Sequence, residues 1–131
     1  GRALSAMDVH AMSMIRSRWF TALNALFEKY DALILPSAQV WPFPVNWESP
    51  KQIAGRAMDT YHRWMEVVIP VSLLGVPSLN IPAGFNDAGL PMGMQIFGPR
   101  HSDAKLLNFA HHWHEATLFA QVRPDIAALS A

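Results

Sequence analysis

The 131-residue sequence contains no cysteine, no long hydrophobic run and no excess of either charge. Without cysteine there is no disulfide framework; this alone does not separate cytoplasm from periplasm, and we expect a cytoplasmic protein. No apolar run approaches ~18 residues, so we expect no membrane-spanning helix, and Gly1-Arg2-Ala3 begins no signal peptide. Ten basic residues balance ten acidic ones, so we expect neither a nucleic-acid partner nor a membrane partner.

Charged residues are scarce as well, at 15% of the chain, whereas 51% of the residues are hydrophobic. This composition excludes a solvated disordered segment and is low in charge for a small free-standing domain. The chain lacks an initiator methionine, and a helical pattern begins close to Gly1, which indicates a cut chain. We therefore expect 1–131 to be part of a single larger domain.

Hydrophobic periodicity predicts a long first helix. Apolar and aromatic residues recur there at steps of three and four, and Ser5 with Asp8 forms an N-terminal capping pair. The stripe consists of Met12, Ile15, Trp19, Leu23, Leu26 and Tyr30. We expect a second helix over about 56–68, ending before Pro70, and a third one capped by Ser102. The buried stripe of the third helix consists of Leu106, Phe109, Ala110 and Trp113.

Short apolar runs closed by proline or glycine predict three strands. The run 32–35 has a length that favours a parallel strand buried on both faces. The runs 78–81, closed by a proline, and 92–97 flank a turn over 86–89, and Gly93 inside the last strand indicates a close neighbour. Helices alternating with strands predict an α/β fold, and because three strands make a thin sheet, we infer that it belongs to a larger one.

The connection over 37–56 is rich in proline and carries Trp41, Phe43 and Trp47. Its proline content argues against a regular element, and its aromatic content argues against an idle linker. Two interpretations stay open: an ordered loop that packs its aromatic rings on the body of the protein, or a part of a pocket wall.

No complete active site is visible from residue spacing. A polar cluster on the third predicted helix lacks the three or four converging ligands of a zinc site, so we expect a solvated face there. It comprises His111, His112, His114 and Glu115. No serine has the strained, glycine-flanked turn typical of a nucleophile, and no lysine lies in an apolar run that would lower its pKa. We therefore assign no catalytic residue, no metal and no cofactor.

Four motifs in register resemble the carboxy-terminal part of the amidase signature family. They are 30–37 (YDALILPS), 74–85 (LGVPSLNIPAGF), 89–99 (GLPMGMQIFGP) and the helix 103–115. The resemblance covers about residues 2–124 and implies an α/β/α domain with helices around a mixed β-sheet, of which some three strands are present here. Such enzymes hydrolyse or transfer amides with a serine, a second serine in a cis peptide and a lysine. These residues belong to the amino-terminal part, so we expect 1–131 to be an inactive carboxy-terminal fragment.

One departure from the family bears on the substrate. In the A chains of the related tRNA-dependent amidotransferases, an aspartate at the position of Met65 pairs with the amino group of glutamine. A thioether cannot bind an ammonium, which favours an amidase acting on an apolar or aryl amide over a glutamine-dependent transferase. The predicted substrate-binding residues are Trp64, Met65 and Val68. The alternative, that they only pack the helix against the sheet, stays open.

The expected partner of the intact parent is a small-molecule amide. A further hypothesis from another class is a non-catalytic module. Because an exposed sheet edge offers unpaired N–H and C=O groups, such a module would self-associate through it.

Overall fold

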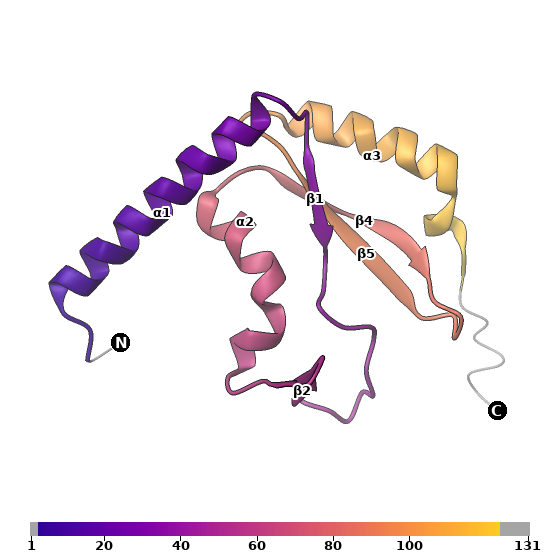
Figure 1. Ribbon diagram of the computed structural model, residues 1–131. Coiled ribbons are helices and arrows are strands. Elements are labelled where there is room, and N and C mark those ends of the chain that lie inside the picture. Colours follow the sequence, from indigo (N-terminus) through magenta and orange to yellow (C-terminus); the bar gives the residue numbers. More distant parts are fainter. Residues whose placement is uncertain (1–2, 124–131) are drawn as a thin grey trace.

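A computed structural model describes residues 3–123 as a three-stranded sheet with helices on both faces (Figure 1). The strands are β1 (Leu33–Pro36), β4 (Ser78–Phe85) and β5 (Pro91–Phe97). Their order is β1-β5-β4, and both pairings are antiparallel, with Ile34 and Leu79 on either side of Ile96. The α/β fold class is confirmed, and β1 and β4 form the two edges of this sheet.

The prediction that the first strand is parallel and buried on both faces was wrong. Strand β1 runs antiparallel to β5, and its residues alternate between half-buried and exposed, with Ile34 49% exposed. Leu33 and Leu35 pack against the core, whereas the other face of the strand is left open in the described residues. The length of an apolar run gives neither the direction of a strand nor the number of its covered faces.

Helix α1 (Ala6–Phe27) begins at the predicted capping box. The hydroxyl of Ser5 accepts a hydrogen bond from the Asp8 backbone N–H at 3.2 Å, and the Asp8 carboxylate accepts one from the Ser5 N–H at 2.8 Å. Of the whole helix only Leu23 is buried. The amino-terminal half of α1 extends away from the sheet (Figure 1).

The second helical region differs from the expected 56–68. It consists of a 3-10 helix, η1 (Tyr61–Val68), which leads directly into α2 (Ile69–Leu74). Pro70 does not end the helix, because the first turn of an α-helix has no intrahelical use for its N–H groups and so tolerates proline. Gly75, with φ of 64°, ends α2 in the left-handed region.

The connection after β1 contains a regular element that the sequence interpretation did not predict. Strands β2 (Gln52–Ile53) and β3 (Arg56–Ala57) form a short antiparallel hairpin. Its turn places Ala54 and Gly55 at φ of 48° and 82°. Two successive positive φ values are typical of the tightest hairpin turns, where glycine is favoured.

Strand β4 continues past Pro82, where it was expected to end, to Phe85. A β-bulge between Pro82 and Gly84 accommodates the proline on this edge strand. The predicted turn after it is confirmed, since the Asn86 side chain accepts hydrogen bonds from the N–H groups of Ala88 and Leu90. Gly93 also has the predicted close neighbours: a Cβ there would lie 2.6 Å from Ser37 Oγ.

Helix α3 (Asp103–Thr117) follows, and η2 (Phe119–Gln121) comes after it. Ser102 occupies the N-cap position, but its side chain makes no capping hydrogen bond, contrary to expectation. Within the predicted stripe, Leu106 is buried and Ala110 and Trp113 pack beside it. Phe109 is 39% exposed, because it lies at the margin of the surface that the sheet covers.

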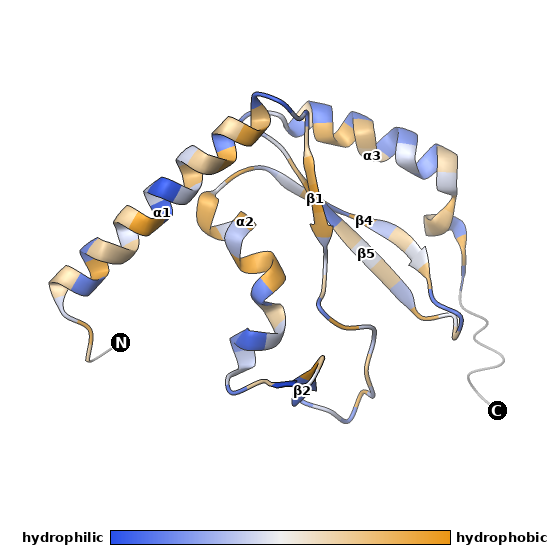
Figure 2. Cartoon of the chain, in the orientation of Figure 1, coloured by the Kyte–Doolittle hydropathy of each residue, from blue (hydrophilic) through white to orange (hydrophobic). Residues whose placement is uncertain are grey.

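Two apolar clusters lie on opposite faces of the sheet. On one face, Leu23 of α1 and Val71 of α2 pack with Phe97. On the other face, Leu106 of α3 packs with Ile81 and Ile96. The hydropathy of the chain follows this arrangement, with β1 apolar throughout and α3 alternating between apolar and polar (Figure 2). No helix within residues 3–123 has the length and apolar character needed to cross a membrane.

Candidate functional site

The sheet face below α2 is apolar at one end and polar at the other. Alternate residues of β5 share this face, and they change from Phe97 to Gln95 and then to Gly93. Phe97 belongs to the core cluster with α1 and α2, whereas Gln95 lies opposite Asn80 of β4. A polar surface is therefore built into the sheet where α2 gives way to η1.

A cavity of about 550 Å³, here called the polar cavity, opens above this surface. Three elements line it: the sheet, the residue that follows β1, and the α2 region. The lining residues include Ser37, Val68, Ser72, Ser78, Asn80 and Gln95. A Cβ at Gly93 would lie 2.6 Å from Ser37 Oγ and 2.8 Å from Asn80 Oδ1, so glycine leaves room for these two groups to approach each other.

A second hollow of about 210 Å³, here called the aromatic pocket, adjoins the polar cavity through Ser37, which lines both. Its rings are those of Trp41, Phe43 and Trp64. Phe43 meets Trp64 edge-to-face with ring centroids 5.7 Å apart, and it stacks on Trp47 at 6.2 Å. Both interpretations of the aromatic loop therefore apply, since its rings pack on the body and also form a pocket wall.

The indole nitrogen of Trp64 is buried and has no hydrogen-bond partner among the described residues. A buried Trp N–H normally finds an acceptor, and an orphaned one is costly. The donor lies within the wall of the aromatic pocket, on η1.

The predicted substrate-binding residues occupy different places around these hollows. Val68 lines the polar cavity and Trp64 lines the aromatic pocket. Met65 is half-buried on η1 and lines neither of them. The structure therefore brings Trp64 and Val68 to adjoining hollows, while their role in binding stays a prediction.

Two residues that the sequence interpretation missed hold η1 in place. Gln95 Nε2 donates to the backbone oxygens of Pro36 at 2.9 Å and Val67 at 3.0 Å. Gln39 Oε1 accepts from the Val67 N–H at 2.9 Å, and Gln39 Nε2 donates to the Arg63 oxygen at 3.4 Å. A polar residue between Met94 and Ile96 was the one available signal for Gln95. Gln39 gave none.

Charges near the site lie on the outer side of η1. Arg63 donates to the Asp59 carboxylate at 2.9 Å and to the Glu66 carboxylate at 2.8 Å. The hydrogen bond and charge of Arg63 lower the pKa of Asp59, and the same carboxylates raise the pKa of Arg63. Within residues 3–123, the polar cavity and the aromatic pocket themselves have no charged lining residue.

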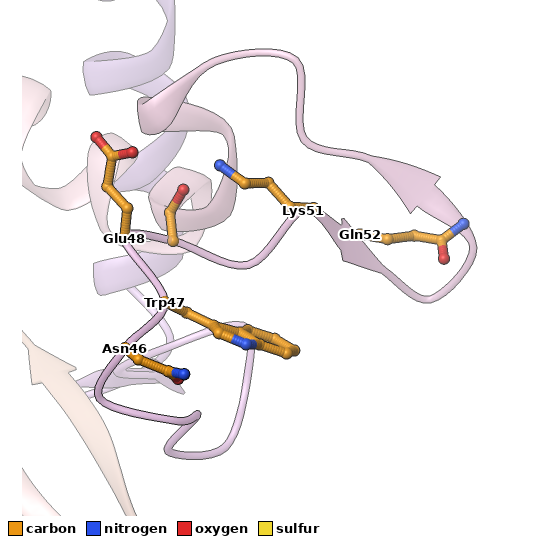
Figure 3. A pocket seen from close by; sticks show the side chains of 6 residues that line it. Asn46, Trp47, Glu48, Lys51 and Gln52 are labelled. Carbon is orange, nitrogen blue, oxygen red and sulfur yellow. The ribbon is translucent and has the colours of Figure 1, made fainter.

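The largest hollow, of about 620 Å³, lies elsewhere, against the loop before the β2–β3 hairpin (Figure 3). Glu48 and Lys51 extend from the loop, and the Trp47 ring lies beside them. Gln52 points away toward the hairpin turn, where it donates to the Gly55 oxygen at 3.1 Å. This hollow combines opposite charges on an irregular loop and contains none of the predicted site residues.

The histidine cluster on α3 faces solvent, as expected. His111 and His112 both lie 3.4 Å from the Glu115 carboxylate, and all three side chains are more than half exposed. Among residues 3–123, no group of three histidine, aspartate or glutamate side chains is arranged to hold a metal ion.

Comparison with known proteins defines the class. The family profile described as Amidase matches residues 1–107. The chain is also 37% identical over 105 residues to the A chain of a glutamyl-tRNA(Gln) amidotransferase from Dehalococcoides mccartyi, with 79% of this chain covered. The chain therefore belongs to the amidase family. It spans 20% of the length of that relative.

Solved structures agree with this assignment. A bacterial aryl acylamidase of the amidase signature family superimposes with a TM-score of 0.80 at 27% identity, covering 93% of this chain and 26% of that one. The A chain of the glutamyl-tRNA(Gln) amidotransferase from Thermotoga maritima matches with a TM-score of 0.56 at 29% identity, covering 70% of this chain and 19% of that one.

Proposed function

We propose that this chain is the carboxy-terminal part of an amidase that hydrolyses the C–N bond of apolar or aryl amides. It contributes strands to the sheet and one wall of the substrate pocket. The nucleophilic serine, the second serine in a cis peptide and the lysine that the family resemblance implies lie outside 1–131. By itself the chain turns over no amide.

The aromatic pocket carries this proposal. Trp41 and Trp64 offer flat apolar surfaces, and aryl groups pack favourably on such rings. Among the described residues, neither the aromatic pocket nor the polar cavity has a carboxylate in its lining to bind an ammonium group. Met65 on η1 is a thioether where the glutamine-using relatives are expected to have an aspartate. A neutral apolar amide therefore fits this wall better than glutamine does.

A second candidate is the A chain of a glutamine-dependent tRNA amidotransferase. The 37% identity to such a chain from Dehalococcoides mccartyi favours it. In that case the amide would be glutamine, and a residue other than Met65 would have to bind its amino group.

A third candidate is a non-catalytic module that self-associates. Strands β1 and β4 are the edges of the described sheet, and an edge strand offers unpaired N–H and C=O groups to a second copy. Sedimentation of the isolated chain decides this: concentration-dependent dimers support it, and a monomer at all concentrations rules it out.

Kinetics of the full-length parent test the first proposal against the second. We expect kcat/KM for an anilide to exceed that for glutamine by at least about tenfold, because a pocket without a carboxylate leaves the ammonium of glutamine unpaired. Met65→Asp should lower this ratio, whereas Met65→Leu, the apolar control, should preserve it. A parent that prefers glutamine overturns the first proposal, and turnover by isolated 1–131 overturns the assignment of the nucleophile to another segment.

A further inference from the structure

The helix that carries Trp64 and Val68 is an unusual element. It is a 3-10 helix of eight residues, and such helices rarely exceed about four residues, because their hydrogen bonds are poorly aligned and their side chains eclipse. None of its residues is fully buried, so burial in a core does not explain its conformation. Contacts from outside the helix must contribute to holding it.

Two glutamine side chains supply such contacts at one residue. The backbone N–H of Val67 donates to Gln39 Oε1 at 2.9 Å, and the backbone oxygen of Val67 accepts from Gln95 Nε2 at 3.0 Å. In a 3-10 helix the donor for that oxygen would be the N–H three residues later, at Pro70, which has none. Gln95 therefore supplies a hydrogen bond that the helix itself cannot form.

The same two side chains connect η1 to the sheet. Gln95 also donates to the backbone oxygen of Pro36, at 2.9 Å, so one amide group joins β5, β1 and η1. Gln95 is only 6% exposed, and water has little access to compete for these bonds. Gln39 follows β1 closely and reaches the Arg63 oxygen as well, at 3.4 Å, one helical turn before Val67.

Val67 lies between the two residues that line the hollows. Trp64, three residues earlier, lines the aromatic pocket, and Val68, one residue later, lines the polar cavity. A shift or rotation of η1 at Val67 would move both side chains together. The distance and orientation of this wall relative to the sheet therefore depend on Gln39 and Gln95.

We propose that Gln39 and Gln95 are positioning residues that fix η1 against the sheet and thereby set the selectivity of the pocket for aryl over small aliphatic amides. This inference rests on the function proposed above. The two glutamines touch the backbone of η1 and act on the substrate only through Trp64 and Val68.

The test compares glutamine variants of the full-length parent. Gln95→Leu removes both donated bonds, and Gln39→Leu removes the acceptor for Val67. Gln39→Glu keeps an acceptor for the Val67 N–H, so it serves as the conservative variant. Gln121→Leu makes the same change on the exposed surface of η2 and is the matched control. Each protein is assayed with an anilide and with a small aliphatic amide, and amide hydrogen exchange is followed in peptides covering 61–70.

We expect KM for the anilide to rise about fivefold in Gln39→Leu and more in Gln95→Leu, corresponding to the loss of one and of two buried hydrogen bonds. KM for the aliphatic amide and kcat for both substrates should change less than about twofold, because the reacting groups are not moved. Exchange in 61–70 should accelerate in both leucine variants. Gln39→Glu should restore most of the anilide KM, and Gln121→Leu should match the wild type.

Equal rises in KM for both amides, or unchanged exchange in 61–70, overturn the inference. If Gln95→Leu does not fold, the comparison of Gln39→Leu with Gln39→Glu decides the outcome alone. A parent that hydrolyses no amide refutes the proposed function and, with it, the selectivity. The exchange measurement then still decides whether the glutamines hold η1, so the two failures are distinguishable.

Discussion

The two ends of the described chain differ in how completely their helices are buried. At the carboxy-terminal end, α3 covers the sheet, and Ile96, Leu106 and Ile81 are 0%, 3% and 7% exposed. At the amino-terminal end, α1 buries Leu23 alone, and Met12 in its apolar stripe is 60% exposed. Both helices were predicted from the same kind of hydrophobic periodicity.

The difference shows what such a pattern specifies. An apolar stripe indicates that a helix face is to be covered, but not that the covering surface lies in the same segment of chain. Among the described residues, Leu73 of α2 is the one residue of another element that lies opposite the stripe of α1, and the groove between them has a volume of about 400 Å³. Since the chain spans a fifth of its curated relative, the rest of the parent can supply the missing cover.

The largest expected effect comes from truncating one residue at each end. Ile96→Ala should lower the free energy of unfolding of the chain by about 3 kcal/mol, because it leaves a cavity in a fully packed site. Met12→Ala should change it by less than about 0.5 kcal/mol, because the side chain is exposed and alanine favours helix. Urea denaturation with an unchanged m-value measures both.

The same pair in the full-length parent sharpens the comparison. If another segment covers α1, Met12→Ala should there cost about 2 kcal/mol or more, as for a buried methionine. An effect of Met12→Ala equally small in both proteins would show that α1 stays exposed and would remove the contrast between the two ends.

A smaller effect is expected at the caps of the two helices. Ser5→Ala should cost about 1 kcal/mol, because it breaks the capping box of α1. Ser102→Ala should cost close to nothing, because the hydroxyl is buried without a hydrogen-bond partner in the described structure and caps no N–H group. Thermal unfolding of both variants provides the measurement. A larger loss at Ser102 than at Ser5 would mean that this hydroxyl has an acceptor after all.

The smallest effect concerns the ion pair between the two ends. Lys105 Nζ donates to the Asp31 carboxylate at 2.6 Å, and this hydrogen bond, with the charge of Lys105, lowers the pKa of Asp31 below 3.8. A carboxyl whose pKa is lowered in the folded state adds stability above its unfolded pKa, and that stability disappears as the pH falls through the folded value. Asp31→Asn should therefore be slightly less stable than the wild type near neutral pH and equal to it in strong acid.

Unfolding measured from pH 7 to pH 2 checks this, and Lys105→Met should reproduce the same profile. The difference should be small and sensitive to salt, because both side chains are largely exposed. A difference that grows in acid would have the wrong sign for this interaction.

Much of the fold could be predicted from the sequence, because periodicity and capping are local. The capping box at Ser5, the turn at Asn86 and the close approach at Gly93 were all confirmed. The errors arose where proline was taken as a stop. Pro70 lies in the first turn of α2 and Pro82 at a bulge, two places where a missing N–H costs nothing.

The site was less accessible to sequence reasoning. Trp64, Met65 and Val68 were predicted from a family resemblance, and the structure places the first and last of them at adjoining hollows. Gln39 and Gln95 bond to Val67 across 28 residues each, a separation at which no local pattern predicts contact. Such contacts follow from tertiary packing, which a single sequence does not reveal.

One contact on α3 has a practical consequence. The Trp113 indole donates to the Pro82 oxygen at 2.8 Å, so this ring is fixed to the bulge of β4, whereas Trp19, Trp41 and Trp47 are each more than 40% exposed. Indole fluorescence depends on the polarity around the ring. A chain in which the other four tryptophans are phenylalanine would therefore carry a single optical reporter for the separation of α3 from the sheet.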